Sequence, residues 1–223
     1  MSFIGKLRSG RRQVPQLWSN ISSLWEICLD VVKSMEAEFA SIASGDRQSA
    51  MDKANGIRLA VKKGLALLRE SRRLSLEASP LDRDNIIIML DSLRALLYSA
   101  KNGSTTLVQR RISPSVVFLL NDIKLQYTLS KLFEKVAQGV SFLSEAVKVL
   151  PKDTARSAEL LASARKASEE IESAKLYLLE KLHEQEKSLD VLSLIQLRDA
   201  ILHESSLAEV FEDCLESLQA LSA

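Results

Sequence analysis

Apolar residues recur every three or four positions along almost the whole chain, which is the spacing of one face of an α-helix. The four prolines all fall between the stretches that have this spacing, and none falls inside one. Proline breaks a helix interior but is tolerated in the first turn, so these positions are typical of helix starts and stops. Only seven glycines and four prolines are present, which is too few for an all-β sandwich. The chain is therefore predicted to be all-α.

Six long helices are expected, and residues typical of helix ends separate them. The first is expected over 15–44, where Gly45 then provides a C-terminal cap and Asp46 the next N-cap. The others are expected over 47–77, 80–102, 114–150, 154–187 and 190–221. Gly103 is expected to end the third helix, and residues 103–113 lack periodicity and are expected to form a connector.

The order of these helices repeats, because each half has two long helices followed by a capped one. Aligning the halves pairs Asp82 with Asp190 and Asp91 with Asp199. We expect a basic tail over 1–14, a first three-helix unit over 15–112 and a second over 113–223. Helices of about 30 residues are about 45 Å long, so the predicted fold is an elongated six-helix bundle made of two tandem three-helix units.

Charge is divided unevenly between the halves, although the net charge is only +1. Residues 1–112 hold 18 Lys and Arg against 11 Asp and Glu, and the remainder holds 12 against 18. In the second expected helix Arg58, Lys62, Arg69 and Arg73 recur along one side, as on a solvated face. The basic half lacks interleaved aromatic residues and a recognition motif, so nucleic acid is not an expected partner.

The first 14 residues combine four basic side chains with three large apolar ones. This segment is either a solvated tail or a contact with anionic lipid, where each basic residue contributes about 1 kcal/mol. The candidate partner or membrane contacts are Lys6, Arg8, Arg11 and Arg12. No apolar run approaches the roughly 20 residues that span a bilayer, and no signal-peptide core is present. A cytoplasmic protein, peripheral to the membrane at most, is therefore expected.

Residues 79–102 hold the most specific pattern. Ser79 can cap a helix that begins at Pro80, and Asp82 follows at capping-box spacing. The run Ser-Pro-Leu-Asp-Arg-Asp-Asn-Ile over 79–86, followed by Asp91 in a Leu-Asp pair, resembles the PhoU-like phosphate transport regulators. It is most similar to the branch that accompanies Pit-type phosphate transporters, although Ala95 stands where that branch has a second aspartate.

This resemblance implies a non-enzymatic cytoplasmic regulator of phosphate transport that docks onto a Pit-type membrane transporter and can form homo-oligomers. It also implies iron- or zinc-like metal clusters held by Glu/Asp-x-x-x-Asp pairs on the second and third helix of each unit. Such pairs place both carboxylates on one helix face, and oxygen ligands suit hard cations. In the first unit, however, the acid of the second helix aligns near Lys62 and Lys63.

The resemblance therefore implies an incomplete set of metal ligands. In the second unit Glu169, Glu170 and Glu172 lie near the expected place, with Lys175 close by, and the sixth helix offers either Glu204 or Glu209, depending on register. The residues that remain as candidates are Asp91, Glu172, Glu204 and Glu209. Because each expected pair lacks a member, we predict a weak metal site or none, and no resident cofactor.

No catalytic motif is present in the sequence. Its two histidines, His183 and His203, form no HExxH motif, and no glycine-rich nucleotide loop occurs. An enzyme is therefore not expected. The alternative to a phosphate regulator is a helical scaffold or tether that keeps the bundle without a phosphate role.

Overall fold

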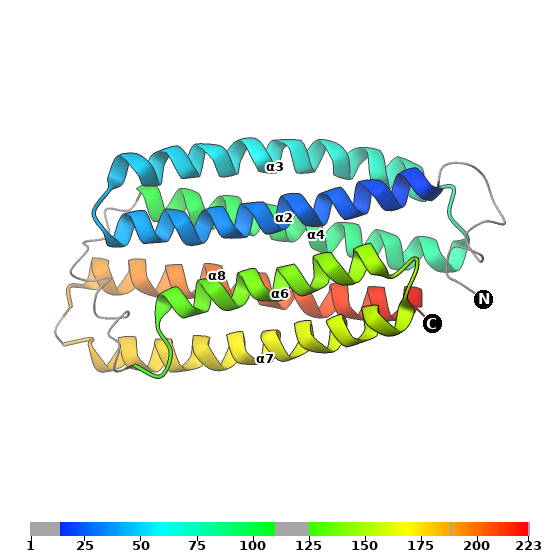
Figure 1. Ribbon diagram of the computed structural model, residues 1–223. Helices are drawn as coiled ribbons and strands as arrows, with labels where there is room; N and C mark the ends of the chain where they lie inside the picture. The colour runs from blue at the N-terminus through cyan, green and yellow to red at the C-terminus, as the bar shows by residue number, and fades with distance from the viewer. Residues whose placement is uncertain (1–13, 110–124, 188, 223) are drawn as a thin grey trace.

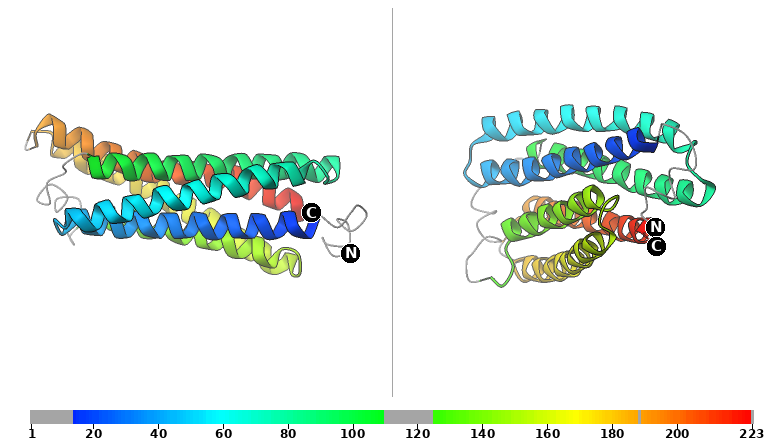
Figure 2. Two further views of the ribbon diagram at one scale, coloured as in Figure 1. Left: turned by 90° about the horizontal axis from the view of Figure 1, so that it is seen from above. Right: turned by 45° about the vertical axis from the view of Figure 1, so that its right-hand side comes forward.

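The structure is a computed structural model and describes residues 14–109, 125–187 and 189–222. These residues form six helices that run back and forth along one long axis (Figure 1). The helices are α2 (Val14–Ala43), α3 (Arg47–Ser75), α4 (Pro80–Gln109), α6 (Leu129–Val149), α7 (Thr154–Glu184) and α8 (Val191–Ser222). The predicted all-α, elongated bundle is confirmed, and the further views of Figure 2 show the same shape.

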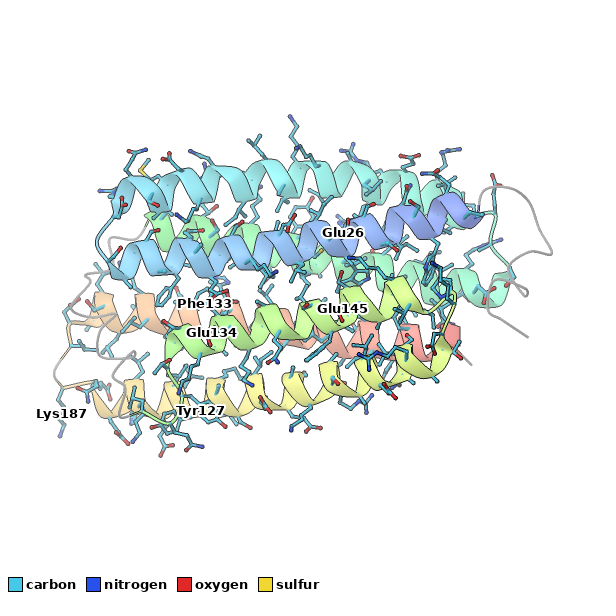
Figure 3. All side chains as sticks on the ribbon, viewed as in Figure 1. Glu26, Tyr127, Phe133, Glu134, Glu145 and Lys187 are labelled. Carbon is cyan, nitrogen blue, oxygen red and sulfur yellow. The ribbon has the colours of Figure 1, made fainter. Side chains whose placement is uncertain are left out.

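The helices pack as two groups of three that lie side by side along the bundle. Helices α2, α3 and α4 contact one another, as do α6, α7 and α8, while α4 packs on α8 and α2 on α6. Buried apolar residues from all six helices form one connected core. Polar contacts also join the groups: the indole nitrogen of Trp18 donates to the carbonyl of Val147, and Lys148 pairs with Glu26. Charged side chains cover the outside (Figure 3).

Short-range signals place most helix ends correctly. Gly45 has a φ of 79°, a value suited to glycine, and Asp46 caps α3 by accepting a hydrogen bond from the Ser49 amide. Helix α4 begins at Pro80, as predicted. The Ser79 hydroxyl accepts from the Asp82 amide at 3.3 Å and donates to the Asp82 carboxylate at 2.7 Å. Ser79 therefore caps this helix.

Replacing Ser79 by alanine is expected to cost about 1 kcal/mol of stability, because the first-turn amide loses its acceptor. Urea denaturation should show a lower midpoint with an unchanged slope. The control is Ser173→Ala, because that exposed hydroxyl bonds only to the carbonyl of Glu169, within its own helix. Equal midpoints for the two variants would contradict the cap.

Two predicted boundaries in the middle of the chain are wrong. Helix α4 does not end at Gly103 but continues to Gln109, so residues 103–109 are not a connector. A Cβ at Gly103 would lie 3.2 Å from Met35 of α2 and 3.4 Å from His203 of α8. This glycine therefore permits close packing of three helices rather than capping one of them.

The predicted helix over 114–150 is also shorter than expected. Residues 125–128 are not helical, and α6 begins at Leu129, where the Thr128 hydroxyl accepts from the Lys131 amide. Tyr127 packs edge-on against Tyr177 of α7, with 5.6 Å between ring centroids, and this contact holds the entry into α6. The predicted start at Pro114 lies outside the described residues.

Another glycine marks tight packing inside the second group of helices. A Cβ at Gly139 of α6 would lie 2.5 Å from the ring of buried Phe211 in α8. Gly139→Ala is expected to destabilise the protein by roughly 1–2 kcal/mol, because the clash exceeds the gain of about 1 kcal/mol in helix propensity. Gly56→Ala should instead stabilise by about 0.5–1 kcal/mol, since open space surrounds that position. The test is the melting temperature of each variant, and a shift of both variants in the same direction would contradict this interpretation.

Candidate functional site

Asp91, the first of the predicted metal ligands, lies on the exposed face of α4 and forms an ion pair with Arg72 of α3. Half of the Asp91 side chain is exposed, at 53%. The guanidinium occupies a carboxylate oxygen that a cation would need, and its positive charge repels a cation. The first unit therefore presents a neutralised acid where the family resemblance implies a metal ligand.

Glu172 and Glu204, the described ligands predicted for the second unit, do not come together either. Glu172 is exposed on α7 and forms an ion pair with Lys175, one turn away, at 2.5 Å. Glu204 is 1% exposed and lies in the interior of the bundle. The side chain of Glu209 and the basic residues of the tail, Lys6, Arg8, Arg11 and Arg12, are outside the described part of the structure.

Glu204 of α8 instead belongs to a buried acidic pair with Glu38 of α2. Glu38 is fully buried, and within the described residues none of the four carboxylate oxygens has a hydrogen-bond partner of good geometry. Burial raises the pKa of Glu38 from 4.5 to about 7, while the nearby Ser104 hydroxyl and the charge of Arg58 act in the opposite direction. Burial also raises the pKa of Glu204 well above 4.5, and the negative charges of Glu38 and Glu36 add to the effect.

These residues do not fit the metal cluster that the family resemblance implies. Among the described residues, no three His, Cys, Asp or Glu side chains are grouped so that they could hold a metal ion. The two cysteines, Cys28 and Cys214, are buried free thiols, and burial raises the pKa of both. No step of a mechanism is therefore assigned to a metal.

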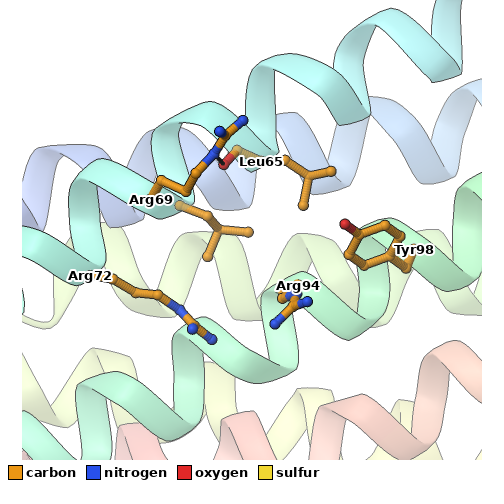
Figure 4. Close-up of a pocket in the computed structure, with 6 residues that line it drawn as sticks. Leu65, Arg69, Arg72, Arg94 and Tyr98 are labelled. Atoms are coloured by element: carbon orange, nitrogen blue, oxygen red, sulfur yellow. Dashed lines mark hydrogen bonds between the residues drawn. The ribbon is translucent and has the colours of Figure 1, made fainter.

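A strongly charged concave feature lies between α3 and α4 (Figure 4). We call it the arginine hollow; it has a volume of about 310 Å³ and is lined by Leu65, Leu68, Arg69, Arg72, Arg94 and Tyr98. Arg72 of α3 and Arg94 of α4 extend into the space between the helices in the close-up. Arg94 lies over the Tyr98 ring, 5.6 Å from its centroid, and Arg69 donates to the Leu65 carbonyl at 3.3 Å.

Sequence reasoning found only part of this hollow. Arg69 was expected on a solvated face of α3, whereas it lines a hollow that α4 completes. The sequence pattern does not distinguish Arg72 and Arg94 from other surface residues. Their local signal is weak: Arg72 follows Leu65 and Arg69 at seven- and three-residue spacing, and Arg94 precedes Tyr98 by one turn. The packing of α3 on α4 is not visible in such spacing.

A second concave feature lies where α7 ends and α8 begins. It has a volume of about 370 Å³, and apolar side chains dominate its lining: Leu179, Leu182, Leu194 and Ile195, with His183, Glu186 and Arg198. Large apolar side chains are exposed beside it, with Val191 at 72% and Leu192 at 63%. We call these exposed residues together with Ile195, which is 44% exposed, the α8 apolar patch.

No protein-family model and no curated protein matches the chain. Matches are found among solved structures. A crystal structure of a PhoU-like protein from Shewanella oneidensis MR-1 superposes with a TM-score of 0.75 at 17% identity, covering 91% of this chain and 97% of that one. A structure from the same organism, described as a PhoU-like phosphate regulatory protein, has the same score and identity and is covered over 94% of its length. The chain has the PhoU-like fold.

The PhoU-like fold extends to a more distant protein. The phosphate transport system regulatory protein PhoU from Streptococcus pneumoniae superposes with a TM-score of 0.58 at 14% identity, over 93% of this chain and 94% of that one. All three superpositions span nearly the whole of both chains, so the whole fold is shared and not just a fragment of it. None of the described helices has a stretch long and apolar enough to cross a membrane.

Proposed function

We propose that this protein is a non-enzymatic regulator of phosphate transport that docks onto a Pit-type membrane transporter from the cytoplasmic side. The observation that carries the proposal is the PhoU-like fold over more than nine-tenths of this chain and of a phosphate transport system regulatory protein. The Ser79–Pro80 turn with Asp82, Arg83 and Asp91 supports the same role and favours the Pit-associated branch. In this proposal the tandem units 15–112 and 113–223 form one PhoU-like domain.

The α8 apolar patch is the surface that we propose for docking. Exposed apolar groups that lie together beside a hollow are typical of protein interfaces. The rim carries His183, Glu186 and Arg198, so a partner must offer apolar side chains at the centre and charges of both signs around them. Cytoplasmic loops of a transporter can supply both.

Charge favours a protein over the lipid surface as the occupant of this patch. The half of the chain that contains α7 and α8 holds 18 acidic residues against 12 basic ones. Anionic lipid attracts clusters of Lys and Arg and repels a net acidic surface. Peripheral membrane contact, if the basic residues of the tail supply it, would then act beside the protein contact and not through the patch.

The test is co-purification of the transporter with the tagged full chain from detergent-solubilised membranes. Leu192→Asp should abolish co-purification, because the charge must be desolvated at the centre of the contact. The matched control is Leu59→Asp on α3, since Leu59 and Leu192 are both 63% exposed. Retention of a phosphate transporter by the wild type and the control, and its loss in the variant, would support the proposal.

The same experiment separates the alternative of a helical scaffold or tether. A scaffold would retain other proteins or form homo-oligomers, and its deletion would leave phosphate uptake unchanged. The neutralised Asp91 favours this alternative, because the metal ligands implied by the resemblance are incomplete. Absence of a phosphate transporter from every purification, with unchanged uptake in a deletion strain, would replace the proposed role by the scaffold.

A further inference from the structure

We infer that the arginine hollow between α3 and α4 binds a phosphate-type anion, that is, a phosphoryl group carrying two negative charges. Three arginines, Arg69, Arg72 and Arg94, line one hollow of about 310 Å³. Arginine presents five donors in a planar fork that matches the oxygens of phosphate, and it stays charged at any pH the protein encounters.

The charge of the hollow suits a doubly negative ligand. Three arginines contribute three positive charges, and Asp91, paired with Arg72, removes one. The remaining charge of +2 offsets that of a phosphoryl group, which carries about −1.5 to −2 at pH 7. A metal cation would meet this excess of positive charge, so the hollow favours an anion where the family resemblance implies a cation.

The positions of the side chains prepare the hollow for binding. Arg94 is held over the Tyr98 ring, which limits its rotamers and lowers the entropy lost on binding. Arg72 donates to Asp91 through one nitrogen, Nη2. The Nε and Nη1 groups of its guanidinium take no part in this ion pair. Leu65 is half-buried and Leu68 is buried, and these two side chains form the apolar wall of the hollow beside the donors.

Two sources can supply the same ligand chemistry: free inorganic phosphate and the phosphomonoester headgroup of a lipid such as phosphatidic acid. A free ion fits inside the hollow. A headgroup requires the α3–α4 face to lie against a membrane, and Arg69, Arg94 and Tyr98 are all exposed on that face. The experiment therefore has one arm for each source.

The first arm is calorimetric titration of the full chain with inorganic phosphate in a low-chloride buffer, and the second is sedimentation with vesicles that contain phosphatidic acid. Arg94→Gln should weaken binding about tenfold, because it removes a charged bidentate donor. Arg73→Gln is the matched control, since Arg73 is exposed on α3 but does not line the hollow. Circular dichroism of each variant checks that the bundle is folded.

Asp91→Asn provides a test of opposite sign. It frees Arg72 and removes the one negative charge paired with it, so phosphate affinity should rise severalfold. A cation site would instead lose affinity. Binding in the phosphate arm assigns the free ion, and binding only to vesicles assigns the headgroup; both support the inference.

Three results would overturn the inference: no binding in either arm, equal weakening by Arg73→Gln and Arg94→Gln, or unchanged affinity in Asp91→Asn. The outcome is independent of the proposed docking, because the α8 apolar patch shares no residue with the hollow. Arg94→Gln should still co-purify with the transporter, and Leu192→Asp should still bind phosphate.

Discussion

Replacing Phe133 by alanine is expected to destabilise the protein by about 3–5 kcal/mol, the range for a fully buried phenylalanine. Phe133 of α6 is 0% exposed and stacks on Phe39 of α2, with ring centroids 4.8 Å apart and planes 14° apart. The two rings come from different three-helix groups, so the cavity would open between them. Urea denaturation monitored by circular dichroism measures the loss, and Figure 3 shows where Phe133 lies on α6.

Phe142→Ala is the matched control on the same helix. Its ring is only partly buried at the edge of the core, so less apolar area returns to water when it is removed. The loss should be clearly smaller than for Phe133, and both variants should unfold in one transition. A loss below about 1 kcal/mol for Phe133→Ala would mean that the contact between α2 and α6 contributes little to the fold.

Stability is expected to fall as the pH rises from about 4.5 to 7, because of the buried pair Glu38 and Glu204. The folded state raises both pKa values, so between the unfolded and folded pKa it binds more protons than the unfolded state. Stability therefore decreases with pH in this window. One pKa unit corresponds to about 1.4 kcal/mol, so the shift of Glu38 from 4.5 to about 7 corresponds to about 3 kcal/mol.

The double variant Glu38→Gln/Glu204→Gln should remove most of this pH dependence, because glutamine keeps the shape and does not ionise. Chemical denaturation at pH 5 and at pH 8 should then give similar free energies of unfolding, with a gain over the wild type at pH 8. Glu145→Gln is the control, because Glu145 is exposed on α6. A wild type whose stability rises from pH 5 to pH 8 would contradict burial of the pair.

The outline of the fold could be predicted because its signals are local. Apolar spacing defines a helix face within a few residues, and caps such as Asp46 and Ser79 act on the amide three positions later. The all-α class, the six long helices and the start at Pro80 therefore followed from the residues themselves.

Two helix boundaries could not be predicted in the same way, because contacts between distant helices determine them. Gly103 has the local signal of a cap, yet α2 and α8 pack against it and the helix continues. Thr128 caps α6 inside what the periodicity predicts as one longer helix, since Tyr127 docks on Tyr177 of α7.

The partners of the buried acids and of the arginines could not be predicted for the same reason. Apolar spacing on α8 does not reveal that Glu204 faces Glu38 of α2, 166 positions earlier in the chain. Nor does it reveal that Arg72 neutralises Asp91 while Arg69 and Arg94 share its hollow. Sequence alone determines which residues can form a helix face, whereas the packing of one helix on another determines which charges meet, because burial and charge partners depend on distance in space.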